Sequence, residues 1–154
     1  MEIRINIQRL ITDIRRKSQL ELANMQDATA RYRIEVGSEK LGEIKRDLES
    51  AVASLSTELF RFMSVPAVDI AEDEISPESV IVFELNGSTR RFDGKEKSFA
   101  QKIHEVLVDL TMHKYYLSVS AGDLAKSHEN QAAGGIVELN RMLRQKNVPK
   151  LVEP

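Results

Sequence analysis

Residues 41–63 read LGEIKRDLESAVASLSTELFRFM, and this stretch decides the fold. Its apolar side chains recur at alternating spacings of three and four residues, which places them on one side of an α-helix. The apolar positions are Leu41, Ile44, Leu48, Val52, Leu55, Leu59 and Phe62. The pattern has two interpretations, a core helix of a bundle or one helix of a coiled-coil dimer. We favour the bundle because the sequence has no second heptad stretch of that quality.

The chain upstream of this helix carries a second amphipathic pattern. Its apolar positions are Ile3, Ile7, Leu10, Ile11 and Ile14. They predict a helix at the start of the chain. The pattern weakens afterwards, so that either one helix continues or a break falls within residues 17–30, where poor helix formers gather. Gly37 followed by Ser38 predicts a stop and a new N-cap.

A β-hairpin is predicted in the second half of the chain. Residues 80–93 read VIVFELNGSTRRFD, with β-branched and aromatic residues on both sides of Asn86-Gly87. This dipeptide is preferred in two-residue hairpin turns. In that register Phe83 faces Arg90, and one face of the hairpin is apolar. Because an isolated hairpin is marginal in water, this face must pack on the helices or on a neighbouring chain.

Two more helices complete the predicted architecture. Ser98 begins a capping-box sequence and should start the third helix, which Gly122 can end. Asp123 should cap a fourth helix that runs to about Lys146, before Pro149. The apolar lines of the two helices are Phe99, Ile103, Val106, Leu107, Leu110 and Leu117, then Leu124, Ala132, Ile136, Leu139 and Leu143. The expected fold is mainly α, a single domain with a helical bundle of about four helices and one inserted β-hairpin.

Two adjacent glycines, Gly134 and Gly135, fall in the middle of the fourth predicted helix. Each costs about 1 kcal/mol of helix stability relative to alanine. Close approach of a neighbouring helix and a ligand cradle are the two explanations. We favour close packing, because no Lys-Ser/Thr pair follows as a phosphate loop would require.

Composition limits the function classes. A chain of 154 residues that is 42% apolar can bury the core of one domain. It has no cysteine, which excludes a disulfide scaffold, a thiolate metal site and a cysteine nucleophile. No apolar run approaches the roughly 18 residues of a membrane span, and the first 30 residues are charged throughout. We therefore expect neither a membrane segment nor a signal peptide.

The net charge of −2 hides an uneven distribution. Residues 64–79 contain five acidic side chains and no basic one, whereas residues 1–63 and 80–154 are each mildly basic. The acidic residues are Asp69, Glu72, Asp73, Glu74 and Glu78. We interpret this segment as a solvated linker between a helical half and a half with the hairpin and the last helices. An acidic patch for a basic partner is the alternative.

Candidate sites for chemistry are few. Glu105, Asp109 and His113 follow an i, i+4, i+8 spacing that could hold a divalent metal on one side of the third helix. We favour solvated pairing along the helix, including Asp109 with His113. His104 and His128 have no nucleophile near them in the sequence. No catalytic residue, metal ligand or cofactor is therefore predicted.

Basic residues give the remaining candidates. Arg90 and Arg91 are adjacent on a predicted strand and point to opposite faces, so at least one is exposed or pairs with a carboxylate, for which a subunit contact is one location. The last stretch contains Arg141, Arg144, Lys146 and Lys150. Basic side chains there complement the dipole at a helix end, and a contact with a phosphate or an acidic partner is the second interpretation.

The order of these elements resembles the head-to-tail connector (portal adaptor) proteins of tailed bacteriophages. The residues that carry the resemblance are the amphipathic opening from Leu10 to Ile14 and the bundle helix from Leu41 to Met63. The stretch VDLTMHKYYL at residues 108–117 and the final LNRML at residues 139–143 complete it. The resemblance covers most of the chain in the order of its elements, although many members of the family lack the long hairpin and the acidic linker.

The resemblance implies a structural virion protein and no enzyme. Its copies would form a dodecameric homo-oligomeric ring, assembled in the host cytoplasm, that joins the portal protein to the tail or to a second ring protein. DNA would pass through the ring without sequence-specific binding, and no membrane is involved. The residues assigned to lateral contact are Phe83, Arg90, Arg91 and Phe92. Those assigned to the axial partner are Arg141, Arg144, Lys146 and Lys150.

Two other functions are considered. A small cytosolic scaffold or regulatory protein could dimerise through the heptad face from Leu41 to Phe62. A metal-dependent enzyme could use Glu105, Asp109 and His113.

Overall fold

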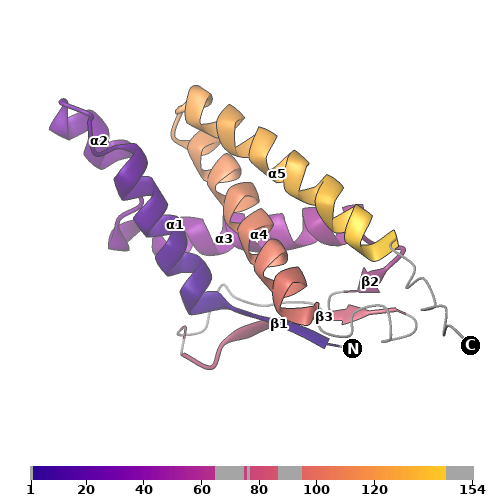
Figure 1. Cartoon of the computed structure of the whole chain (residues 1–154). Helices are drawn as coiled ribbons and strands as arrows, with labels where there is room; N and C mark the ends of the chain where they lie inside the picture. The colour runs from indigo at the N-terminus through magenta and orange to yellow at the C-terminus, as the bar shows by residue number, and fades with distance from the viewer. Residues whose placement is uncertain (1, 65–74, 76, 87–94, 145–154) are drawn as a thin grey trace, which may run out of the picture.

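Helices stacked over a small antiparallel sheet make up the fold (Figure 1). The structure is a computed structural model, and it describes residues 2–64, 75, 77–86 and 95–144. In chain order the elements are β1 Glu2–Asn6, α1 Ile7–Glu21, α2 Ala28–Ile34, the 3₁₀ turn η1 Ser38–Lys40, α3 Leu41–Glu58, β2 Met63–Ser64, β3 Val80–Leu85, α4 Glu96–Ser118 and α5 Gly122–Arg144. The predicted class, mainly α with a small β element, is confirmed.

The chain begins with a strand, and the prediction of a helix from Ile3 is wrong at this point. The strand reads EIRIN, in which Ile3 and Ile5 are buried between polar neighbours. This alternation has the period of a strand rather than of a helix. Asn6 then caps α1, because its side-chain oxygen accepts the backbone N–H of Arg9 at 2.9 Å. The helical stripe therefore starts at Ile7.

β3 is the central strand, in the order β1-β3-β2, and both pairings are antiparallel. Ile81 and Phe83 lie opposite Ile5 and Ile3, and all four side chains are buried. The sheet thus turns an apolar face into the core that it shares with the helices, which is one of the two arrangements that the strand pattern left open. The predicted return strand, residues 88–93, lies outside the described part of the chain.

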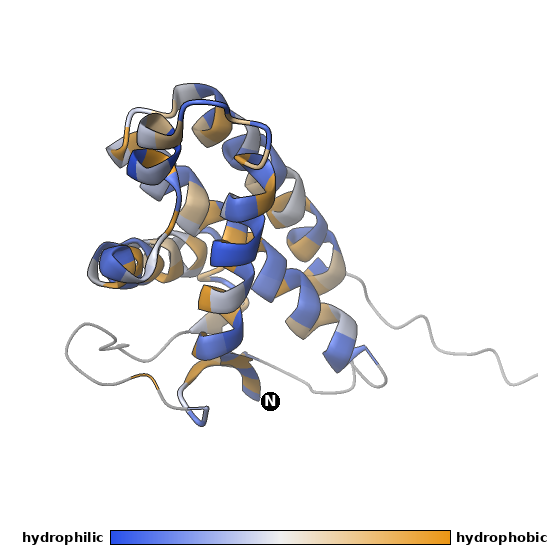
Figure 2. Cartoon of the chain, turned by 90° about the vertical axis from the view of Figure 1, so that its left-hand side faces the viewer, coloured by the Kyte–Doolittle hydropathy of each residue, from blue (hydrophilic) through white to orange (hydrophobic). Residues whose placement is uncertain are grey.

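α3 is a core helix, in agreement with the bundle interpretation. Ile44, Leu48 and Leu55 have no exposed surface, and the helix packs against α4, which crosses it. Figure 2 shows apolar and polar stretches alternating along the helices of the bundle. Leu41, at the start of the stripe, is 37% exposed, and the helix ends at Glu58 rather than continuing to residue 63. The face that would form a coiled-coil dimer is therefore covered by the protein's own core.

Of the two boundaries predicted before α3, the helix break is present and the N-cap is not. The break expected within residues 17–30 is present, since α1 ends at Glu21 and α2 begins at Ala28. Asp27 caps α2 through its side-chain oxygen. Ser38 was predicted to be an N-cap, but it is the first residue of η1, and no side-chain hydrogen bond caps that turn.

α4 and α5 form an antiparallel pair joined by a short turn. α4 begins at Glu96, before the predicted capping box at Ser98, and no side chain caps it. The left-handed residue of the turn is Ser120, with φ of 61°, and not Gly122, which is the first residue of α5. A serine in this conformation carries strain that a glycine would avoid.

Gly135 allows α4 and α5 to approach each other closely. A Cβ atom at this position would overlap Cγ2 of Val106, a buried side chain of α4. A Cβ atom at Gly134 would meet open space. Close helix packing therefore explains Gly135, as predicted, and nothing in the structure explains Gly134.

We expect alanine to have opposite effects at the two glycines. Gly134→Ala should stabilise the protein by about 1 kcal/mol, because alanine favours the helix and meets no obstacle. Gly135→Ala gains the same propensity but overpacks against Val106, which costs about 1–3 kcal/mol. Urea unfolding of both variants measures the difference, and Val106→Ala as the common background should reduce it. Equal stabilisation by both alanines would contradict the close approach.

Candidate interaction surfaces

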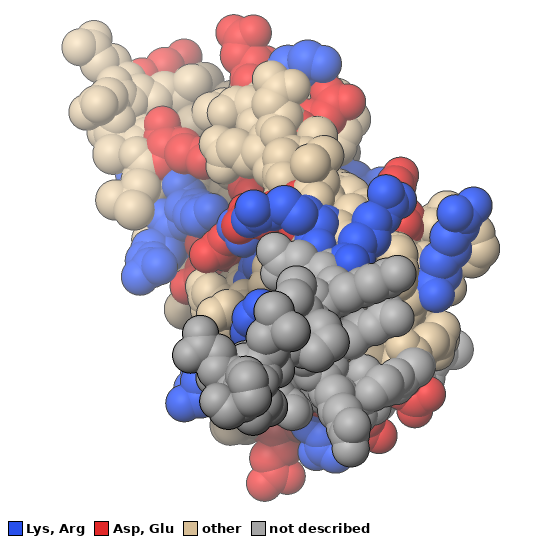
Figure 3. All heavy atoms as spheres, turned by 45° about the vertical axis from the view of Figure 1, so that its right-hand side comes forward, with Lys and Arg blue, Asp and Glu red and all other residues tan. Residues whose placement is uncertain are grey.

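The C-terminal half of α5 presents a basic face to solvent. Leu139 and Leu143 point into the core, so Arg141 and Arg144 lie on the outer side of the helix. The side chain of Arg141 is 68% exposed. Figure 3, which brings this side of the molecule forward, shows Lys and Arg side chains in a band across it. An open hollow on the outer side of the helix is lined by Val137, Asn140, Arg141 and Arg144.

The carboxylate of Glu138, beside this hollow, forms an ion pair with Lys102 of α4. Lys102 donates a hydrogen bond to Glu105 at 3.2 Å and lies 3.1 Å from Glu138 of α5. Arg141 lies 3.8 Å from the other oxygen of Glu138, a long separation for an ion pair. Most of the N–H donors of the Arg141 guanidinium are therefore available to a partner molecule.

The opposite end of the bundle exposes apolar side chains. α1 and α4 both end there, and α2 lies beside them (Figure 1). Leu20, Tyr32 and Leu117 are 69%, 68% and 57% exposed. These three large exposed apolar side chains make this end a candidate contact surface.

The other residues that the sequence assigned to contacts have different placements. Phe83 is completely buried opposite Ile3 in the sheet, so its assignment to lateral contact is wrong. The strand pattern revealed an apolar face but did not reveal that the same chain covers it. The remaining assigned residues, Arg90, Arg91, Phe92, Lys146 and Lys150, lie outside the described residues.

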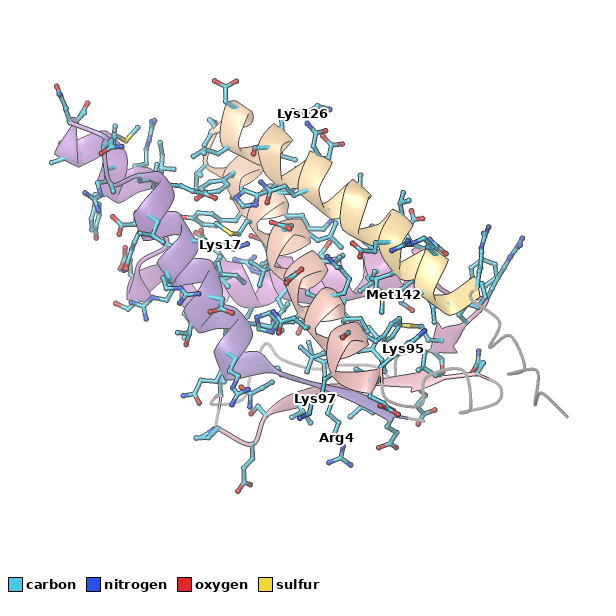
Figure 4. The ribbon with its side chains drawn as sticks, in the orientation of Figure 1. Arg4, Lys17, Lys95, Lys97, Lys126 and Met142 are labelled. Atoms are coloured by element: carbon cyan, nitrogen blue, oxygen red, sulfur yellow. The ribbon has the colours of Figure 1, made fainter. Side chains whose placement is uncertain are left out.

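A buried ionic network joins α1, α4 and α5. The side chain of His128 in α5 is 2% exposed and lies between two carboxylates. Its Nδ1 is 2.8 Å from Asp109 Oδ1 in α4, and its Nε2 is 2.7 Å from Glu21 Oε1 in α1. Lys17 reaches from α1 toward α4 and lies 3.9 Å from Asp109 (Figure 4). The hydroxyl of Tyr116 donates a hydrogen bond to Glu21 at 2.8 Å.

The network favours the charged form of its histidine. Burial lowers the pKa of His128, but hydrogen bonds to Asp109 and Glu21 and the charges of both carboxylates outweigh it and raise the pKa from 6.5 to about 9. Burial raises the pKa of Glu21, but hydrogen bonds from His128 and Tyr116 outweigh it, and the net shift is downward. At neutral pH an imidazolium thus lies between two carboxylates. It is sealed from solvent, so its role is to hold three helices together.

The spacing of residues along the sequence does not indicate this network, and the partner that it favoured for Asp109 is wrong. Asp109 does not pair with His113 on a solvated helix face, because its side chain turns toward His128 on the next helix. His113 Nδ1 instead lies 2.9 Å from the backbone carbonyl oxygen of Ala125. Glu105 accepts a hydrogen bond from Lys102. Glu105, Asp109 and His113 therefore each have a different partner and do not face a common metal position. No group of three His, Asp or Glu side chains in the described segments is arranged to hold a metal ion.

A second histidine links α1 to α4. His104 Nε2 lies 2.7 Å from Asp13 Oδ2, and both side chains border a polar hollow with Arg9 of α1. The hydroxyl of Thr12, which also lines the hollow, donates to the backbone carbonyl of Gln8. This hydroxyl is engaged in its own helix, so the pair has the arrangement of a structural contact rather than of a catalytic triad.

Stability should fall as the pH rises from about 6.5 to above 9. The pKa of His128 is about 9 in the folded protein and 6.5 without its partners, so its contribution is complete below pH 6.5 and is lost as the imidazolium deprotonates. A shift of this size corresponds to about 3 kcal/mol. Urea unfolding between these pH values measures the fall. A His128→Gln variant should lack it, and an equal fall in that variant would contradict the assignment.

None of the helices within residues 2–64 and 95–144 is long and apolar enough to cross a bilayer.

Comparisons with known proteins identify no relative. The chain matches no protein-family model, no curated protein and no solved structure at a significant level.

Proposed function

We propose that the chain is a structural protein of a tailed-bacteriophage virion, a head-to-tail connector whose copies form a ring between the portal protein and the tail. The observation that carries the proposal is the division of the surface into two ends. One end of the bundle exposes Leu20, Tyr32 and Leu117, and the other carries the basic face of Arg141 and Arg144. A connector has to bind a different partner at each end. The order of the elements, which resembles that family, supports the same function.

The rigidity of the bundle also supports this function. The imidazolium of His128 joins α1 to α5, and the His104–Asp13 contact joins α1 to α4. These contacts hold the apolar end and the basic end in a fixed relation, as a subunit that transmits load between two partners requires. Most of the binding energy would come from burying the apolar end, with charged pairs setting orientation.

The alternative functions have less support. A scaffold that dimerises through residues 41–62 would need a face on which Leu48 and Leu55 are accessible, and both are completely buried. A metal enzyme would need Glu105, Asp109 and His113 to face one point, whereas each has a different partner.

Mass photometry of the purified chain, alone and with the portal protein of the same genome, tests the proposal. We expect a ring of about twelve copies that binds the portal. Lys146→Glu combined with Lys150→Glu should weaken portal binding and leave the ring intact. Lys126→Glu is the control, since that side chain is 68% exposed at the other end of α5. A chain that stays monomeric and never joins the portal would contradict the function.

A further inference from the structure

The polar hollow between α1 and α4 contains hydrogen-bonding groups that have no partner within the described part of the chain. Its volume is about 390 Å³, and the side chains that line it are all polar or charged, namely Gln8, Arg9, Thr12, Asp13, Gln101 and His104. We propose that this hollow binds the phosphate or carboxylate group of a small polar molecule, between the guanidinium of Arg9 and the imidazole of His104. Such binding is separate from ring formation, so it does not depend on the connector function.

Arg9 supplies the positive charge of the hollow. Its side chain is exposed in the first turn of α1, and no carboxylate of the described segments pairs with its guanidinium. Arg16, by contrast, already lies 3.4 Å from Asp13. The N–H donors of Arg9 are therefore open to a ligand, and their planar arrangement matches the oxygens of a phosphate or carboxylate group.

The carboxylate that lines the hollow is already engaged on both of its oxygens. Asp13 Oδ2 lies 2.7 Å from Nε2 of His104, and Asp13 Oδ1 faces the guanidinium of Arg16. Both neighbours offset the negative charge of Asp13, whereas Arg9 has no such counter-charge beside it. The electrostatic potential in the hollow therefore favours an anion over a neutral or cationic ligand.

His104 presents its second ring nitrogen to the hollow. Because a carboxylate only accepts hydrogen bonds, the contact with Asp13 places a proton on Nε2. The side chain is 14% exposed, yet Nδ1 is not sealed from solvent and has no hydrogen bond to any described residue. A proton on Nδ1 gives an imidazolium that donates to Asp13 and to the ligand at the same time. A bound anion should therefore favour the imidazolium.

The size of the hollow and its two amides indicate a ligand larger than a bare ion. A water molecule occupies about 30 Å³ of liquid, so a volume of about 390 Å³ exceeds the need of a single anionic group several times. Gln8 has no side-chain hydrogen bond to the described residues, and the amide of Gln101 donates only to Glu105, at 3.3 Å. Carboxamides bind hydroxyl groups as donor or acceptor. A phosphate ester or a carboxylic acid that also carries hydroxyl groups fits this set.

NMR titration of the isotope-labelled full chain tests the site, at constant ionic strength. The probes are glycerol phosphate, malate and, as a neutral control, glycerol. We expect at least one of the two anions to give saturable shifts confined to the lining of the hollow, and glycerol to give none. Saturation by one anion alone identifies the ligand as a phosphate ester or as a hydroxy acid, and saturation by neither overturns the proposal.

Three variants separate this site from general attraction of anions to basic side chains. Arg9→Gln and His104→Gln should each raise the dissociation constant at least about tenfold, because each removes a charged hydrogen bond. Glutamine extends about as far as Nε2 of histidine, so His104→Gln can keep the contact with Asp13 while it loses Nδ1. Arg33→Gln removes the same charge from an exposed position in α2 and should leave the dissociation constant unchanged.

The ring nitrogens of His104 give a readout that a purely structural histidine would not change. Their chemical shifts should show that Nδ1 gains a proton as the anion saturates the site, and unchanged shifts would overturn the assignment. Equal weakening by Arg9→Gln and Arg33→Gln would overturn it as well, and so would shifts that spread without saturation over the basic surface. Thermal unfolding checks the fold of each variant. Arg9→Gln alters an exposed side chain and keeps the test decisive if His104→Gln unfolds.

Discussion

Replacing His128 with alanine should destabilise the protein by about 3–5 kcal/mol, because the two carboxylates that it separates remain buried without their shared cation. Asp109 is 10% exposed and Glu21 27%, so water can solvate them only in part. Lys17 lies 3.9 Å from Asp109, and its charge, although it also acts on Glu21, does not take the place of a cation that is hydrogen-bonded to both carboxylates. Urea unfolding at pH 7 measures the loss.

His113→Ala is the control for this prediction. Its ring makes one hydrogen bond to the backbone carbonyl of Ala125, so we expect a loss of about 1 kcal/mol. A triple variant with Glu21→Gln, Asp109→Asn and His128→Leu removes all three charges and should recover much of the loss. If His128→Ala costs no more than His113→Ala, the network does not hold the helices together.

Leu48→Ala should cost about 2–5 kcal/mol without changing the oligomeric state of the protein. Leu48 is completely buried within its own protomer, and its truncation leaves a cavity in the core. Leu41→Ala on the same stripe removes a side chain that is 37% exposed, and its cost should be below about 1 kcal/mol. Urea unfolding and mass photometry are measured together. Unchanged stability with a lower mass would instead favour the coiled-coil dimer.

The parts of the fold that could be predicted are those that depend on local periodicity. The stripe of α3 extends over many turns, and a helix of that length follows from spacing alone. The first strand could not be found in this way, because Ile3 also fits the spacing of the following helix. Its pairing with Phe83, far along the chain, decided between the two structures.

The residues of the candidate site also differ in whether local periodicity predicts their position. The outward position of Arg141 and Arg144 follows from the apolar line of their own helix. The ionic network was hidden because His128 lies 107 residues from Glu21 and 19 from Asp109, beyond any helical repeat. An aspartate at the edge of the apolar stripe of α4 was the one local signal. A carboxylate so close to a core requires a partner, but the sequence does not say from which helix the partner comes.

The pairing of β1 with β3 also constrains how the chain is made. Glu2 lies opposite Glu84, so during synthesis, which starts from the N-terminus, β1 has no partner until β3 has left the ribosome. Ile3 and Ile5 stay exposed to water or to chaperones during that time. Closure of the sheet joins residues distant in sequence and should be a slow step of folding, later than the pairing of α4 with α5.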